Sequence, residues 1–127
     1  MINWGEIAHF RSDEFLHPEL LNPTMAYMLD DLRQQYGKPL LVSSSYRDDI
    51  SNARVAGAKD SSHIVDGVTG YYSGVDLTVP GNKIRSQDMF KLVRIALALG
   101  FRRCGLYRDH LHLDLETRLP QDVIWLA

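Results

Sequence analysis

The residues best suited to chemistry lie in one stretch near the end of the chain, residues 109–116, which reads DHLHLDLE. Polar and apolar residues alternate there, which is the period-two pattern of a strand with one buried face. Neutral histidine and ionised carboxylate are the usual nitrogen and oxygen ligands of zinc, so the polar face could supply part of a metal site. A solvated strand face is the simpler alternative, and further ligands must come from elsewhere in the chain. Leu111, Leu113 and Leu115 are expected in the core, and His110, His112, Asp114 and Glu116 on the polar face, with Glu116 at the protein surface.

The candidates outside that stretch are His63, Asp76 and Arg47. His63 lies in a long segment rich in Asp, Ser, Asn and Gly, and irregular segments of such length in compact domains are more often functional than idle. Asp76 lies on a second short alternating stretch, opposite the apolar residues. Together with residues 109–112, the set of candidates is His63, Asp76, Asp109, His110 and His112, with Arg47 nearby. Two imidazoles and one carboxylate from this set would leave a zinc ion one open position, as in catalytic sites.

Two helices and four strands are expected to position these residues. Asn22 and Pro23 predict the start of a helix that ends at Gly37, and Ser86 predicts the cap of a second helix that ends at Gly100. A leader rich in loops, with one short helical turn, is expected before the first helix, and the tail is expected to fold back onto the core. The strands are expected at residues 39–47, 75–79, 101–107 and 110–116, the last two as a hairpin.

Length and composition favour one domain, residues 1–127, with its own core. The net charge of −2 lacks the excess of Lys and Arg typical of proteins that bind nucleic acid or anionic membranes. Cys104 is the single cysteine, which excludes an internal disulfide and a cysteine zinc ribbon. No apolar run approaches the ~20 residues of a membrane span, and no signal-peptide pattern opens the chain, so cytoplasmic synthesis is expected.

Several short motifs occur in a fixed order along the chain. In this order they resemble the M15-type zinc D-Ala-D-Ala carboxypeptidases and endolysin peptidases, which share a fold with the N-terminal signalling domain of hedgehog proteins. The opening segment, residues 9–15, is similar to the phage and bacterial branch, so the resemblance spans nearly the whole chain. The matching motifs are Ser44-Ser45-Tyr46-Arg47 with Asn52 and Gly57 after it, Ser61-Ser62-His63, Gly74-Val75-Asp76, and Gly105-Leu106-Tyr107 before His112-Leu113-Asp114.

The resemblance implies a role for each matched position. His63, Asp76 and His112 would be the zinc ligands. Asp109, three residues before the last ligand, matches the general base, although an ordinary turn residue is the alternative. His110 matches a histidine that orients water or stabilises the transition state. Arg47 would face substrate or the developing oxyanion, Ser61, Tyr71 and Tyr72 would contact substrate, and Asp114 would support a ligand imidazole or an arginine.

The chain departs from the family pattern between the first two ligands. Residues 64–75 lie between His63 and Asp76, a longer segment than the family usually has, and Gly74 replaces the usual Ala. We expect a lengthened loop with Tyr71 and Tyr72 at its tip. Asp66 becomes a competing ligand because its spacing from His63 also permits chelation. Asp76 is preferred, since it lies on an alternating strand.

The resemblance thus implies an α+β fold, with a small mostly antiparallel sheet, two helices on one face and a zinc cleft on the other. Zinc held by two histidines and a carboxylate would support hydrolysis of peptide bonds. The expected substrate is the stem peptide of bacterial peptidoglycan, cut as by a D-Ala-D-Ala carboxypeptidase or an L-Ala-D-Glu endopeptidase. A small monomeric phage-type lytic enzyme fits this expectation, acting at the cell wall after release through a membrane lesion. A non-catalytic metal-binding module, such as a virion component, is the alternative.

Overall fold

The described part of the chain builds one mixed sheet and two long helices. The structure is a computed structural model that describes residues 1–48 and 61–127, so Asn52 and Gly57 of the first motif lie outside the described residues. The helices are α1 (Pro23–Tyr36) and α3 (Ser86–Leu99), and the strands are β1 (Leu41–Ser44), β2 (Gly74–Thr78), β3 (Arg103–Leu106), β4 (Leu111–Asp114) and β5 (Val123–Leu126).

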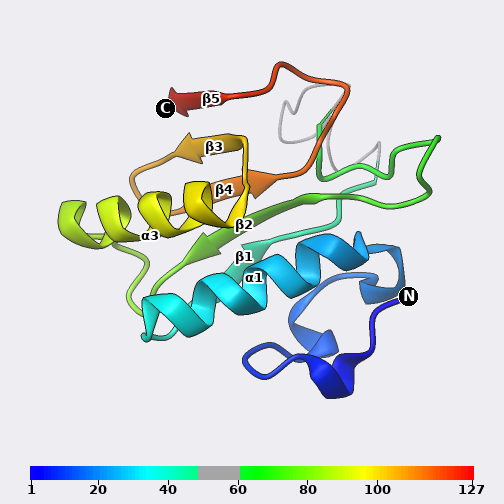
Figure 1. Cartoon of the computed structure of the whole chain (residues 1–127), viewed down its shortest axis with the longest axis horizontal. Coiled ribbons are helices and arrows are strands. Elements are labelled where there is room, and N and C mark those ends of the chain that lie inside the picture. The colour runs from blue at the N-terminus through cyan, green and yellow to red at the C-terminus, as the bar shows by residue number, and fades with distance from the viewer. Residues whose placement is uncertain (49–60) are drawn as a thin grey trace.

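The five strands lie in the order β1-β2-β4-β3-β5. All neighbours are antiparallel except β3 and β5, which are parallel. Figure 1 shows α1 and α3 side by side on the same face of this sheet, and the two helices contact each other. The predicted α+β class, with two helices and a mostly antiparallel sheet, is therefore confirmed.

The helix ends follow the predicted signals at three of four positions. The Asn22 side chain accepts hydrogen bonds from the first turn of α1, Pro23 is its first residue, and Gly37 ends it with a φ of 76°. Gly100 ends α3 with a φ of 106°. The predicted cap at Ser86 is one residue late: the capping position is occupied by Arg85, which makes no side-chain capping bond.

The leader contains three short 3-10 turns where one turn was expected. They span Trp4–Glu6, Ser12–Glu14 and Pro18–Leu20. Phe10 and Phe15 are buried, so the leader contributes to the core. The tail folds back as expected, but it does so as a fifth strand, β5, which the sequence pattern did not predict.

Candidate metal centre

One row of residues crosses the sheet on the face turned away from the helices. Directly paired residues of neighbouring strands share a face. The register pairs Ser44 with Asp76, Asp76 with His112, His112 with Gly105, and Gly105 with Trp125. The row therefore places two predicted ligands, Asp76 and His112, on adjacent strands at the middle of the sheet.

The third predicted ligand, His63, reaches this row from a segment that lies directly on β2. The backbone N–H groups of Ser73 and Gly74 donate to the carbonyl of Ser62, at 3.0 and 2.8 Å. A Cβ at Gly74 would lie 2.1 Å from Ser62 Oγ, so even alanine does not fit there. Only glycine at this position therefore lets the segment with Ser62 and His63 lie this close to β2.

The three predicted ligands converge. One donor atom from each of His63, Asp76 and His112 lies within 4.8 Å of the other two. Oδ1 of Asp76 is 2.8 Å from Nδ1 of His112 and 3.4 Å from Nε2 of His63. The two imidazoles are almost fully buried, with 3% and 9% of their side chains exposed. This set could hold one metal ion, and two histidines with one carboxylate suit zinc.

Hydrogen bonds behind the two imidazoles fix their tautomers. Nδ1–H of His63 donates to the carbonyl of Ser45 at 2.5 Å. Nε2–H of His112 donates to Oδ2 of Asp114 at 2.7 Å, and Arg103 donates to the other oxygen of that carboxylate at 2.8 Å. These contacts leave Nε2 of His63 and Nδ1 of His112 as the nitrogens that face Asp76 and could bind a metal ion, and Asp114 occupies the supporting position that was predicted.

The electrostatics of the centre favour a cation. Burial alone would raise the pKa of Asp76, but hydrogen bonds from His112 and His63 hold it well below its usual range. Burial lowers the pKa of His112, but hydrogen bonds with Asp114 and Asp76 raise it above its usual value. The two shifts have opposite signs because each group is stabilised in its charged form by its partners: Asp76 by the two imidazoles, and His112 by the carboxylates of Asp114 and Asp76.

His110 and Asp109 lie beside the three ligands as a hydrogen-bonded pair. Nε2 of His110 is 3.8 Å from Oδ2 of Asp76. Nδ1 of His110 is 2.7 Å from Oδ1 of Asp109, whose side chain is 68% exposed. This hydrogen bond lowers the pKa of Asp109. Thus it is the imidazole that faces the centre, and the carboxylate lies behind it.

Arg47 and Ser61 form a layer next to His63. The guanidinium of Arg47 donates to Ser61 Oγ at 3.3 Å, and the backbone N–H of Arg47 donates to the carbonyl of His63 at 2.8 Å. Among the described residues, Nε of Arg47 is the buried side-chain polar atom that has no hydrogen-bond partner. The backbone contact places Arg47 next to His63, and a guanidinium is a side chain suited to bind an oxyanion or a carboxylate.

The structure corrects the predicted place of Tyr72. This residue is not at a loop tip: it is 0% exposed, and its hydroxyl donates to the carbonyl of Leu16 at 2.9 Å. Tyr71 is half-buried and lines a cavity of about 390 Å³ formed largely by leader residues, Trp4 among them. The lengthened loop bends earlier, at Gly70, which has a φ of 79°.

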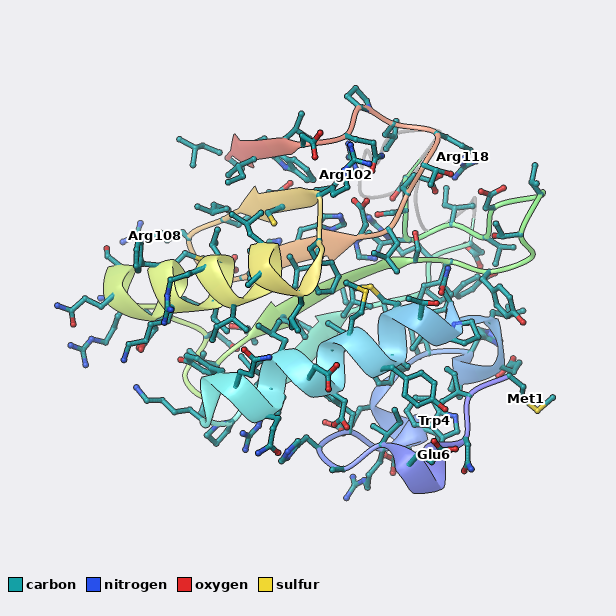
Figure 2. The ribbon with its side chains drawn as sticks, viewed as in Figure 1. Met1, Trp4, Glu6, Arg102, Arg108 and Arg118 are labelled. Atoms are coloured by element: carbon teal, nitrogen blue, oxygen red, sulfur yellow. The ribbon has the colours of Figure 1, made fainter. Side chains whose placement is uncertain are left out.

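Two acidic residues also lie where the sequence did not place them. Asp66, the competing ligand, accepts a hydrogen bond from the N–H of Val68 and faces Arg118 at 3.8 Å, so it is not part of the ligand group. Glu116, expected on the surface, is 3% exposed and forms a hydrogen-bonded ion pair with Arg118 at 2.8 Å. Figure 2 shows Arg118 on the segment that joins β4 to β5.

The fold and the donor set together define an α+β protein with a candidate mononuclear metal centre on its sheet. The family model described as Peptidase M15 matches residues 8–114, so this chain belongs to the Peptidase M15 family. The predicted resemblance is confirmed, and it supports a peptidase acting on a peptide substrate; peptidases of this family are generally zinc-dependent. A search of curated proteins returned no match. In the described part of the chain, no helix is both long and apolar enough to cross a membrane.

Proposed function

We propose that this protein is a zinc-dependent peptidase that hydrolyses stem peptides of bacterial peptidoglycan, at a D-Ala-D-Ala or an L-Ala-D-Glu bond. The observation that carries the proposal is the convergence of His63, Asp76 and His112, with both imidazoles turned toward one point. We further propose that residues 1–127 form a single domain, active as a monomer at the cell wall as a phage-type lytic enzyme.

Zinc, when bound by this set, would act as a Lewis acid that polarises a carbonyl group and brings the pKa of water close to 7. The chain itself supplies the orientation. Ser45 and Asp114 keep the two imidazoles in the ligating tautomer, and Asp76 stays ionised because its pKa is lowered.

His110 and Asp109 are assigned the proton transfers as a pair. The sequence resemblance gave this role to Asp109 alone. In the structure, Nε2 of His110 lies 3.8 Å from Asp76, while Asp109 binds the far nitrogen of the same ring. His110 would accept the proton that the attacking water loses and pass it to the leaving amine, with Asp109 stabilising the imidazolium form.

Arg47 and Ser61 are assigned to substrate. A guanidinium remains charged at all relevant pH values, so Arg47 can bind a substrate carboxylate or stabilise the developing oxyanion. Ser61 Oγ accepts hydrogen bonds from the Arg47 guanidinium and from the N–H of His63, which ties the substrate side to a ligand. Tyr72 has no place in this assignment because its side chain is fully buried.

The lengthened loop between His63 and Asp76 is the feature of the sequence that would favour a non-catalytic module. In the structure the loop closes on itself: the N–H of Gly70 donates to the carbonyl of Asp66, and the N–H of Asp66 donates to the carbonyl of Tyr71. The extra residues thus form their own turn and leave the three ligands together. This geometry supports a metal centre despite the longer loop, and the digestion experiment separates catalysis from metal binding alone.

The experiment that tests the proposal is digestion of purified sacculi, with mass spectrometry of the released fragments. Wild type is expected to create new amino termini on stem peptides, whereas His63→Ala and His110→Ala are not. His63→Ala should also lose zinc, but His110→Ala should retain it. His9→Ala is the control, because His9 lies in the leader, where its side chain is hydrogen-bonded to Gln34 of α1. Zinc binding without peptide release from any wall type would favour the non-catalytic module.

A further inference from the structure

Trp125 is a residue of β5 that contacts the metal centre, through His112. Its indole lies 5.4 Å from the imidazole of His112, measured between ring centroids. Its Nε1–H donates to the hydroxyl of Tyr107 at 3.1 Å. The guanidinium carbon of Arg103 lies over the ring, 5.1 Å from its centroid. The indole is half-buried, and it lies outside residues 8–114, the part matched by the family model.

Gly105 makes these contacts possible. It is the register partner of Trp125, and a Cβ there would lie 2.5 Å from Cε2 of the indole and 2.6 Å from Nε1. Any larger residue at this position would push the ring away from the sheet, because the Cβ is fixed to the backbone. The indole of Trp125 therefore occupies the space that a side chain at residue 105 would fill.

Each neighbour of Trp125 either is a proposed ligand or contacts a residue of the metal centre. His112 is itself a proposed ligand. Arg103 donates to the carboxylate that holds Nε2 of His112. Tyr107 stacks on His110, with ring centroids 4.2 Å apart and planes 11° from parallel. One indole thus contacts a proposed ligand, the arginine that holds Asp114, and the tyrosine that stacks on His110.

We propose that Trp125 is a positioning residue of the metal centre, which fixes the ring plane of His112 and, through Tyr107, that of His110. An imidazole binds a metal well only when its lone pair points at the ion, and outer contacts of this kind change metal affinity or activity by about 10- to 100-fold. The inference about zinc affinity stands on geometry alone. The inference about turnover rests on the proposed function.

Zinc affinity shows whether Trp125 orients the metal ligands or only packs against the sheet. Competition with a chromophoric chelator is expected to show affinity about 10- to 100-fold weaker for Trp125→Leu. Trp125→Phe should lose less, since a ring remains while the Nε1–H is lost. Trp4→Phe is the control, because Trp4 packs on Phe15 in the leader. Figure 2 shows Trp4 far from β5. Unchanged zinc affinity in folded Trp125→Leu would overturn the proposal.

Gly105→Ala tests whether the indole is the mediator. The added methyl group should displace the ring and weaken zinc binding in the wild-type background. In a Trp125→Ala background the same change should have little further effect, because no ring remains to be displaced. Additive losses in the two backgrounds would contradict the proposed mechanism.

A fluorescence measurement keeps the proposal testable even if Trp125→Leu does not fold. The chain has two tryptophans, so the Trp4→Phe variant reports Trp125 alone. Zinc addition should change its emission, since the indole contacts His112. Absence of any change on zinc binding would overturn the proposal.

Turnover provides the final measurement. At saturating zinc, Tyr107→Leu should lower kcat on a soluble stem peptide with KM unchanged, whereas Tyr107→Phe should retain most activity because the stack with His110 remains. Unchanged kcat for Tyr107→Leu would contradict the part that concerns His110. If wild type releases no peptide, the proposed function fails, and the zinc and fluorescence measurements still decide the role of Trp125.

Discussion

Oδ2 of Asp114 lies 2.7 Å from Nε2 of His112, and the same carboxylate is held by Arg103 through its other oxygen. The carboxylate is fully buried, and the opposing hydrogen bonds keep its pKa below the usual value although burial acts to raise it. A neighbour two residues along the same strand thus decides which nitrogen of His112 faces the metal position.

Asp114→Asn should therefore weaken zinc binding by about 10- to 100-fold. The amide retains the shape but loses the charge, so it no longer favours one tautomer of His112. Because Arg103 then becomes a buried cation without its partner, a loss of about 3–5 kcal/mol in the free energy of unfolding is expected as an upper range. Isothermal titration with zinc and chemical denaturation measure the two effects.

Asp122→Asn is the matched control for this change. Asp122 binds Arg102 through two hydrogen bonds, at 2.7 and 2.8 Å, but its side chain is 71% exposed. Breaking an exposed pair should leave zinc affinity unaltered and stability nearly so. Equal losses of zinc affinity in the two variants would show that Asp114 has no special role.

Gly74→Ala should detach His63 from the sheet. The new Cβ would lie 2.1 Å from Ser62 Oγ and 2.9 Å from the Ser62 carbonyl carbon, so backbone as well as side chain must move. Overpacking of this kind costs about 1–3 kcal/mol. Zinc titration is expected to show a large loss of affinity while circular dichroism shows a folded protein.

Gly67→Ala serves as the comparison, because a Cβ at Gly67 meets nothing within 4 Å. It lies in the same lengthened loop and should bind zinc like wild type. Wild-type zinc affinity in Gly74→Ala would mean that His63 is not a ligand or that its segment adapts without cost.

The sequence predicted which three side chains converge, because each proposed ligand carries a local signal. His112 and Asp76 lie on stretches with period-two alternation, and alternation determines which face of a strand a residue occupies. The third proposed ligand, His63, was identified from the order of the motifs around it. The caps of α1 were likewise predictable, since Asn22 and Gly37 act on backbone groups only a few residues away.

The wrong or missing predictions concern which segments pack over the strand faces. Alternation shows which face of a strand a residue occupies, but not what covers that face. Glu116 was expected on the surface, but the segment after β4 returns and buries it against Arg118. Trp125 lies in a tail without a strong pattern, and its contact with His112 depends on a parallel pairing between distant segments. Gly105 was the available signal, since a glycine within a strand often marks a close approach.

Cys104 should be inert in the native protein. Burial, with a smaller contribution from Asp114, raises the pKa of this thiol to about 11. A raised pKa means less thiolate, so at pH 8 the native protein should react with Ellman's reagent far more slowly than a free cysteine of pKa about 8.5. Denaturant should release one reactive thiol per chain. Rapid reaction of the native protein at pH 8 would contradict the burial of Cys104.

Tyr72→Phe distinguishes the structural role found for this tyrosine from the substrate contact that the sequence suggested. The change removes the hydrogen bond to the Leu16 carbonyl, which is expected to cost about 1 kcal/mol in the free energy of unfolding. Zinc affinity, kcat and KM should remain at wild-type values, because the buried ring cannot contact substrate. Tyr71→Phe, which alters the more exposed neighbour, is the comparison. A raised KM in Tyr72→Phe, at unchanged zinc content and stability, would restore the substrate role and require the loop to open during catalysis.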